Sequence, residues 1–599
     1  MSNKRRASIK RRESERASLR LQLRREPLLL VLVGYLALPL VFFPWTFDPF
    51  AVPRVALLIP LTAVSAIAIG LHWERIEWRS PWIMGLGLLC LALLLSWMAS
   101  VDRRNALLGN VGYRFGLVTW IALLAGSVLS SVIVRNSGYL TLLLRVGLIV
   151  AGAVGAYAVL QGLGADPFDW AEEWDRAFST LGNPNDLAAF GVLATAFVGG
   201  LPSVERRSID WRVIAGFLFF AGMVTLSGSR SGIAALLLAT LVALGACAVS
   251  GWPAASLRRL ATALATMVVV GLVVTTATGE LGNLARRTVD TLDSDSPQSL
   301  STRMSIWDGS LAAYRAHPLF GLGPDGLLVD FSRHQPGDLG YPFDAATGTG
   351  LDPLVGSPHS AALEVMVTSG PLALAAIVLV SFLVAARAST AVRRDDAPAI
   401  PFVLGAVVGF AAMALFNPLS IANVGVFVVL VGSLVGMATG AVEARRMGRQ
   451  RRITGAAVVV GASTTMVLSG LLLAADVSAY RAGQADARRN DSAAWRHAHS
   501  AARLMPLDAA YARLEAQSVA NQAFAARDPA KAADAERLQT RFLDRFAGVA
   551  SDYLLLARLR IISGEPGAEA ALAAALDASP HGIDTANSVA VLRTLEESQ

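Results

Sequence analysis

The chain has 599 residues, of which 54% are hydrophobic and only 16% are charged. Globular proteins carry about 25% charged residues, so this composition is that of a membrane protein. The mean hydropathy of +0.51 agrees with this interpretation. The net charge is +7, but the basic residues cluster between apolar runs and form no stripe interleaved with aromatic residues. This pattern favours membrane topology and anionic lipid headgroups, and it argues against nucleic-acid binding.

The two cysteines, Cys90 and Cys247, lie inside apolar runs, which excludes a disulfide framework and a cysteine-based zinc site. The sequence contains no P-loop, dinucleotide fingerprint or HExxH motif, so ATP, NAD and zinc are not indicated. Asp293 and Asp295 match a DxD pattern, but they lie in a polar linker. We therefore expect neither a cofactor nor a metal.

Residues 1–26 form a basic tail, which we expect to be disordered on the cytoplasmic membrane surface. Apolar runs of a length that spans a bilayer follow the tail. No small-x-small cleavage site follows the first run, so it is predicted to be an uncleaved transmembrane helix. Thirteen spans are predicted, at about 27–43, 55–72, 82–100, 116–134, 139–162, 186–202, 213–228, 231–250, 260–278, 358–388, 400–416, 424–442 and 455–475.

Positive residues indicate the orientation of these spans. Every second connection is short and basic, from the turn with Arg75 and Arg79 to the arginine-rich stretch 445–452. By the positive-inside rule these connections and the N-terminus are cytoplasmic, and the C-terminus lies outside. The Gly/Ser-rich stretch 227–232 divides an apolar run that is too long for one span. The prediction is an all-α, polytopic membrane bundle of about 12–13 helices.

Two further parts complete the predicted domain organisation. The transmembrane domain, 27–475, contains a large extracytoplasmic loop at 279–357. Residues 476–599 are rich in Ala, Arg, Asp and Glu with helical patterning, and Pro506 and Pro580 are 74 residues apart. That spacing is about two periods of a tetratricopeptide repeat, which predicts an extracytoplasmic helical-repeat domain. An irregular helical bundle is the alternative.

Arg230, in the sequence SGSRSG, is the first candidate site residue. A charged side chain at the membrane edge is costly in hydrocarbon, so it should face the bundle interior or a polar cleft. The flanking glycines and serines let a bulky anion approach the backbone. The alternative is an arginine that extends to the lipid headgroups.

Arg303 is the second candidate, in a segment predicted to be a helix that ends at His317 and Pro318. Arg303 and Trp307 fall on one face of this helix, with Gly-rich sequence after it. An arginine at this position can contact a phosphate or diphosphate with two hydrogen bonds. A helix lying on the membrane surface, with Arg303 paired to lipid or to Asp308, is the alternative.

His359 begins the tenth predicted span. An imidazole titrates near neutrality and can take a proton from a hydroxyl group. A structural histidine at a helix start is the alternative, and His317 and His334 are rival candidates.

Six motifs in this order resemble the bacterial O-antigen ligase and O-antigen polymerase superfamily. They cover about residues 30–440 and are TFDPFAVPR (46–54), LLGNVGYRFGL (107–117), STLGNPNDLAAF (179–190), SGSRSG (227–232), RMSIW with HPLFGLGPDG (303–326) and PHSAALEVMVTSGPL (358–372). Ser360, Ala362 and Thr368 depart from the family's pattern, which has Asn, an aromatic residue and Glu there. We therefore expect the acceptor side of the site to differ from that of other members of the family.

The resemblance implies a metal-independent, inverting glycosyltransferase that uses a polyprenyl-diphosphate glycan donor at the extracytoplasmic face. By resemblance, Arg230 and Arg303 would bind the donor diphosphate, and His359 would activate the acceptor hydroxyl. Arg114 matches an early outer-face arginine, while Asn183 and Asn185 match the family's GNPN element, so these three are expected to support the site.

The implied function is O-antigen ligase-like transfer of a glycan to a lipid, glycan or protein acceptor in cell-surface glycan assembly. A glycan polymerase and a protein O-oligosaccharyltransferase of the same superfamily remain open. A transporter or flippase of lipid-linked saccharide is a second class, and a scaffold that docks envelope proteins through the repeats is a third. Charged residues near the predicted bilayer midplane are almost absent, which argues against a transporter.

Overall fold

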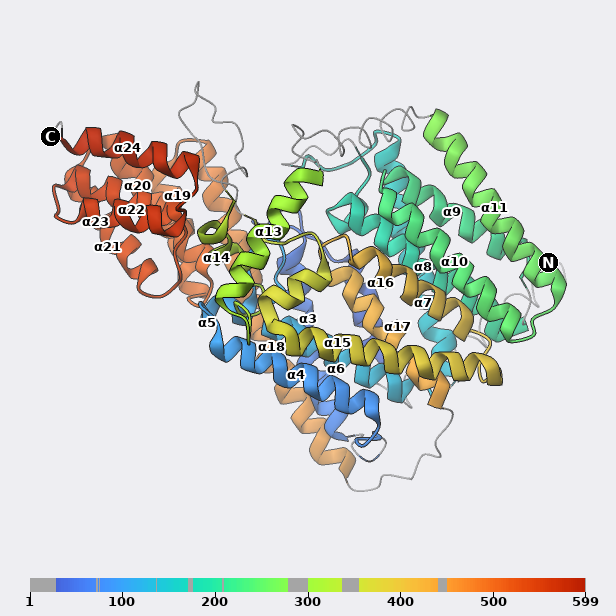
Figure 1. Cartoon of the computed structure of the whole chain (residues 1–599). Helices are drawn as coiled ribbons and strands as arrows, with labels where there is room; N and C mark the ends of the chain where they lie inside the picture. The colour runs from blue at the N-terminus through green and yellow to red at the C-terminus, as the bar shows by residue number, and fades with distance from the viewer. Residues whose placement is uncertain are drawn as a thin grey trace, which may run out of the picture.

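The computed structural model describes residues 29–71, 74, 76–135, 137–170, 176–206, 209–277, 300–336, 355–439 and 450–597. Within these ranges the regular elements are all helices, which confirms the predicted all-α class (Figure 1). The basic tail, the DxD pattern at 293–295 and much of the predicted loop 279–357 lie outside the described residues.

The membrane part consists of helices and two short 3-10 turns. They are α2 (Leu29–Ala37), η1 (Leu38–Leu40), α3 (Ala51–Leu71), α4 (Pro81–Ala99), α5 (Arg103–Leu108), α6 (Leu117–Ile133), α7 (Ser137–Gly162), η3 (Ser179–Leu181), α8 (Pro184–Arg206), α9 (Trp211–Leu226), α10 (Arg230–Val249), α11 (Ala254–Ala277), α13 (Leu300–Ala316), α14 (Leu327–His334), α15 (Ala361–Arg394), α16 (Ile400–Ala414), α17 (Ile421–Thr439) and α18 (Gln450–Ala487).

A helix lies at each of the thirteen predicted spans within the described ranges. Eight are long and apolar enough to cross a membrane by length and composition, and four shorter apolar helices accompany them. The chain is therefore a polytopic membrane helix bundle, as predicted. The end at which α8, α10, α15 and α17 begin is called the predicted outer end below.

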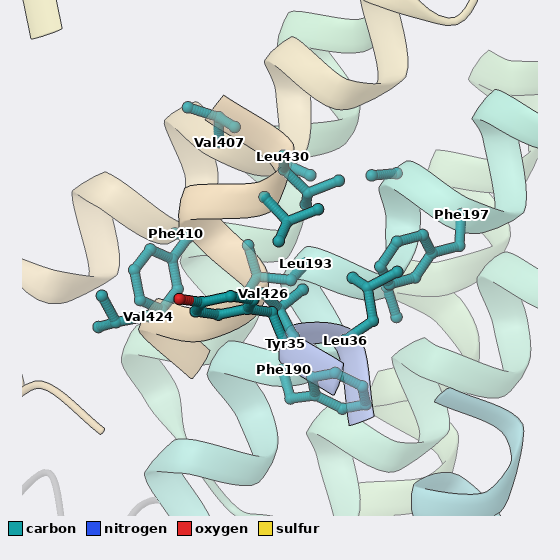
Figure 2. Packing of buried hydrophobic residues seen from close by; sticks show 14 of the residues in the cluster. Tyr35, Leu36, Phe190, Leu193, Phe197, Val407, Phe410, Val424, Val426 and Leu430 are labelled. Carbon is teal, nitrogen blue, oxygen red and sulfur yellow. The ribbon is translucent and has the colours of Figure 1, made fainter. Parts of the chain in front are cut away.

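Large side chains fill the centre of the bundle between α2, α8, α16 and α17. Figure 2 shows Tyr35, Phe190, Phe197 and Phe410 meeting there with aliphatic residues. The Tyr35 hydroxyl donates to the Ala122 carbonyl at 2.6 Å, so the one polar atom of that ring is satisfied. Buried aromatic packing of this kind fixes the relative positions of the helices that carry the outer-end residues.

Glycines allow close contact between α10 and α16. A Cβ atom on Gly405 or Gly409 would clash with the backbone oxygen of Ala239 or Ala235, respectively. Small residues four apart let membrane helices approach closely and gain dispersion contacts. This contact holds the beginning of α10, which carries Arg230, against the end of α16.

The predicted break between α9 and α10 is confirmed. Gly228 has a φ of 59°, a left-handed conformation that glycine adopts at little cost. Ser229 then caps α10, since its Oγ accepts from the Gly232 amide at 3.3 Å. The turn leaves Arg230 as the first residue of α10 at the predicted outer end.

Helix α15 is broken near its beginning. Gly370 has φ 80° and ψ 173°, and Pro371 follows it, so no amide hydrogen is available for the Val367 carbonyl. That carbonyl instead accepts from the Leu322 amide at 3.0 Å, and the Thr368 carbonyl accepts from the Gly323 amide at 2.8 Å. The Gly-rich segment after α13 is thereby fixed onto the broken helix.

Six helices form the C-terminal part: α19 (Asp491–Leu504), α20 (Ala509–Ala526), α21 (Pro529–Leu543), α22 (Ala550–Ser563), α23 (Ala568–Ala578) and α24 (Ile583–Glu597). Consecutive helices pack on one another as three pairs. The pairs begin 38 and 39 residues apart, at Asp491, Pro529 and Ala568. The identification of these pairs as tetratricopeptide repeats stays a prediction. Helix α18 runs continuously through the predicted domain boundary at 476.

Polar contacts dock this helical part on the predicted outer end, beside α5, α13 and α14 (Figure 1). Arg104 Nη1 donates to the Arg545 carbonyl at 2.9 Å. Arg333 Nη1 lies 3.4 Å from Asp577 Oδ2, joining α14 to α23. The helical part therefore packs on α14, which in turn packs on α13, the helix that carries Arg303.

Candidate functional site

The three residues proposed for donor binding and catalysis come together at the predicted outer end. Arg230 begins α10, Arg303 lies in the first turn of α13, and His359 immediately precedes the cap of α15. All three side chains are exposed. Desolvation and the neighbouring charge of Arg230 lower the pKa of Arg303. Two guanidinium groups that are close enough to repel each other are an arrangement that can bind an anion.

His359 is the third member of this group. Surrounding protein atoms desolvate its ring in part, and this effect, together with the positive charge of Arg303, lowers its pKa from the ordinary value of 6.5. A histidine with a lowered pKa is neutral at neutral pH, which is the form that accepts a proton. Arg303 is thus close enough to both Arg230 and His359 for their charges to interact.

Helix α13 is tied directly to the His359 loop. Trp307 follows Arg303 by one helical turn, and its Nε1 donates to the Pro358 carbonyl at 2.9 Å. Because Pro358 precedes His359 in the chain, this bond sets the distance between the α13 face and the imidazole. Trp307 was predicted to share a face with Arg303, but its partner was not predicted.

A second set of contacts holds the His359 loop from α15. Glu364 Oε2 accepts from Ser357 Oγ at 2.9 Å, and Ser357 Oγ accepts from the His359 amide at 3.2 Å. His359 has a φ of 54°, a conformation that non-glycine residues seldom adopt. Ser360 then caps α15. The loop is therefore held in an unusual backbone conformation by a buried carboxylate.

Glu364 was not recognised from the sequence as a contributor to the site. The available signal was an acidic residue in an otherwise apolar stretch, AALEV. Such a residue is costly to bury unless it has hydrogen-bond partners, so its presence indicates a specific polar environment. The partner, Ser357, lies before the helix and was not identifiable by spacing alone.

The rival histidines, His317 and His334, gather around a different carboxylate. Their Nε2 atoms lie 3.9 and 3.2 Å, respectively, from Asp330 Oδ2. Arg333 also approaches Asp330, at 3.8 Å. These residues form part of the contact between α13, α14 and the C-terminal helices.

Asn183 and Asn185 lie at the beginning of α8. Asn183 Oδ1 accepts from the Asn185 amide at 2.8 Å, and its carbonyl accepts from the Leu187 amide at 3.0 Å. With Pro184 at the first helical position, Asn183 makes the GNPN element a helix start. Asn185 lines a pocket with residues of α16 and α17. Asn183 thus positions the backbone, while Asn185 contributes to the lining of the pocket.

Arg114 occupies a different environment from the other two arginines. It is only 2% exposed, and its Nη1 lies 2.5 Å from Asp508 Oδ2 at the start of the C-terminal helices. Burial disfavours the charged guanidinium, but Asp508 and neighbouring acidic groups raise the pKa of Arg114 above its ordinary value. Arg114 therefore joins the membrane part to the C-terminal part.

Asp325 links two of the motifs that carry the family resemblance. Its Oδ2 accepts from the amides of Asn110 at 2.6 Å and Phe115 at 3.2 Å. The segment after α13 is thereby bound to the loop between α5 and α6. The motifs at 107–117 and 303–326 are consequently joined into one structural unit.

Residues 215–378 match the model of the family described as O-antigen ligase. This match confirms the predicted O-antigen ligase superfamily. The matched segment contains Arg230, Arg303 and His359, whereas Arg114, Asn183 and Asn185 precede it. The match supports a multi-pass membrane protein with a ligase- or polymerase-type function in cell-surface glycan assembly, with lipid-linked glycan substrates. A search of curated proteins finds no match to the chain.

Proposed function

We propose that the protein transfers a glycan from a polyprenyl-diphosphate donor to an acceptor hydroxyl at the extracytoplasmic face of the bacterial plasma membrane. The N-terminus would lie in the cytoplasm, with the C-terminal helices outside. The observation that carries this proposal is the position of Arg303, close enough to both Arg230 and His359 for charge coupling. The site thereby combines anion binding with a neutral base.

In this proposal Arg230 and Arg303 bind the donor diphosphate. The bond between the anomeric carbon and the diphosphate oxygen breaks, and its electron pair leaves with the diphosphate. The two guanidinium groups stabilise the negative charge that develops on that oxygen in the transition state. The donor is already activated, so neither a nucleotide nor a metal is required.

His359 would accept the proton of the acceptor hydroxyl while the hydroxyl oxygen forms the new bond to the anomeric carbon. Attack from the face opposite the leaving diphosphate inverts that carbon. The loop contacts from Trp307 and Glu364 would keep the imidazole beside Arg303 during this step. Asn185 would contribute on the donor side of the same site.

The C-terminal helices would present the acceptor or bind an envelope protein. Their docking against α14 supports this role, because α14 packs on α13, the helix that carries Arg303. Helical-repeat surfaces commonly bind other macromolecules. The acceptor itself can be a lipid core, a growing glycan or a protein.

Transfer by the purified protein in lipid nanodiscs tests this function, with a labelled polyprenyl-diphosphate glycan and a hydroxyl-bearing acceptor. Arg230→Ala, Arg303→Ala and His359→Ala should each reduce covalent transfer by at least about a hundredfold, as is typical when a charge-stabilising group or a base is lost. Arg315→Ala, an exposed arginine on the same helix as Arg303, is the matched control and should retain activity.

Three outcomes separate the candidate functions. Covalent transfer that depends on the three residues supports the proposal. Movement of the labelled donor across a vesicle membrane without covalent transfer would favour a transporter. Full activity in all three variants would contradict the site assignment.

A further inference from the structure

A polar pocket lies at the predicted outer end, where α8 begins, α16 ends and α17 begins. Phe410 and Met413 line its apolar side. The polar residues that line it come from three segments and are Asn185, Asp186, Asn417, Ser420 and Asn423. We propose that this pocket binds a hydroxyl group of a saccharide substrate. The inference rests on the proposed function and assigns a subsite to it.

Asn423 supplies a buried acceptor to the pocket. Its Nδ2 donates to the Asp186 carbonyl at 3.0 Å, so its Oδ1 is directed away from that bond. The residue is 1% exposed, and Oδ1 has no hydrogen-bond partner among the described residues. An unsatisfied buried acceptor costs about 1–3 kcal/mol. A ligand hydroxyl that donates to this oxygen recovers that cost.

The chemistry of the lining selects against an anion. The side chains that line the pocket include no Lys or Arg, so the lining offers no cation to an anionic ligand, while the Asp186 carboxyl oxygens can accept hydrogen bonds from hydroxyls. Asn185 adds an amide that can donate to a hydroxyl oxygen. The pocket is small, so it suits a single hydroxyl group, with Phe410 beside it as an apolar contact for the adjoining carbon.

The pocket and the Arg230 turn share a wall. Asn417 Nδ2 donates to Ser231 Oγ at 3.0 Å and to the Met413 carbonyl at 2.9 Å. Ser231 directly follows Arg230 in the chain. If Arg230 holds the diphosphate, the sugar bonded to it would lie near Asn417. Asn417 also lines the pocket, so it separates the pocket from the Arg230 turn. The first sugar of the donor is thus within reach, and so is an acceptor sugar that meets it.

Binding measurements on the full-length protein in nanodiscs test this inference with two probes: a polyprenyl-diphosphate saccharide and the same polyprenyl diphosphate without a sugar. We expect Asn423→Leu and the milder Ser420→Ala to weaken binding of the saccharide probe. Loss of one hydrogen bond to a buried group predicts a decrease of about tenfold. Binding of the sugar-free probe should be unchanged.

Ser433→Ala is the matched control. Ser433 lies on the same helix and is 2% exposed, and the substitution removes a buried hydrogen bond between Ser433 Oγ and Ser130 Oγ at 3.0 Å. It should leave the binding of both probes unaltered. If Asn423→Leu instead raises the KM for the acceptor about tenfold and leaves donor binding unchanged, the same subsite binds a hydroxyl of the acceptor sugar.

If Asn423→Leu and Ser420→Ala weaken the binding of both probes equally, the inference is overturned. It is also overturned if neither probe binding nor the acceptor KM changes in these variants. If the unaltered protein binds neither probe, both the proposed function and the inference fail. If the unaltered protein binds both probes and the variants bind them equally well, with an unchanged acceptor KM, the pocket subsite is contradicted and the proposed function is not.

Discussion

Charge and desolvation act on the His359 ring in the same direction. Partial burial and the positive charge of Arg303 both disfavour the imidazolium, so the pKa of His359 lies below its ordinary value of 6.5. A general base must be unprotonated to act. The arginine that is proposed to bind the donor therefore also keeps the base in its active form.

This coupling predicts a specific pH profile. As pH falls, kcat/KM for transfer should decline with an apparent pKa below 6.5, because His359 remains neutral to a lower pH than an isolated histidine. Initial rates between about pH 5 and 8 measure this profile, a range that covers the titration of histidine. An acid limb at or above 6.5 would contradict the predicted environment. His317→Ala is the control and should leave the limb in place, because His317 lies beside Asp330 instead.

At the scale of elements, the site depends on how α13 meets α15. The Trp307 indole joins them through the Pro358 carbonyl, while the segment after α13 bonds to carbonyls exposed by the break at Gly370. These contacts fix the arginine and the histidine on two rigid elements. Positioning of this kind allows reacting groups to meet without further ordering.

Trp307→Phe should reduce kcat about tenfold, the factor that corresponds to losing one hydrogen bond of ordinary strength, while the KM for the donor changes little. The substitution keeps an aromatic ring but removes the donor to Pro358. Steady-state kinetics separate the two parameters. Trp211→Phe, at an exposed position on α9, is the matched control. A rise in KM with kcat unchanged would indicate that Trp307 contributes to donor binding instead.

The elements were largely predictable, since apolar runs predict membrane helices and SGSRSG predicts the turn before α10. The break in α15 was less accessible, because its stability depends on partners from the segment after α13. The proximity of Arg230, Arg303 and His359 was expected only through the family resemblance. Arg114 was grouped with them, but its buried partner Asp508 is nearly four hundred residues away and no local pattern indicates it.

At the scale of the whole molecule, a buried polar network joins the two parts of the chain. Asp508 pairs with Arg114, and the Tyr511 hydroxyl donates to Asp476 Oδ1 at 2.7 Å. Asp476 Oδ2 in turn accepts from the Asp48 amide at 3.0 Å. The C-terminal helices are therefore held against the membrane part by groups excluded from water.

Asp508→Asn should destabilise this docking by about 3–5 kcal/mol, because it leaves the Arg114 charge buried without its partner. Faster limited proteolysis around the start of α20 and a lower unfolding temperature in detergent would report the loss. Replacing both partners, as Arg114→Met with Asp508→Leu, should be less destabilising than the single change. Equal or greater destabilisation in the double variant would contradict an account based on the unpaired charge.

The central claim is that Arg230, Arg303 and His359 form one site for the donor diphosphate. An experimental structure of the full-length protein in nanodiscs with a polyprenyl-diphosphate glycan bound tests this claim most directly. We predict density for the diphosphate between the guanidinium groups of Arg230 and Arg303, with the anomeric carbon facing His359. Density for the diphosphate elsewhere, such as beside His317 and His334, would contradict the account.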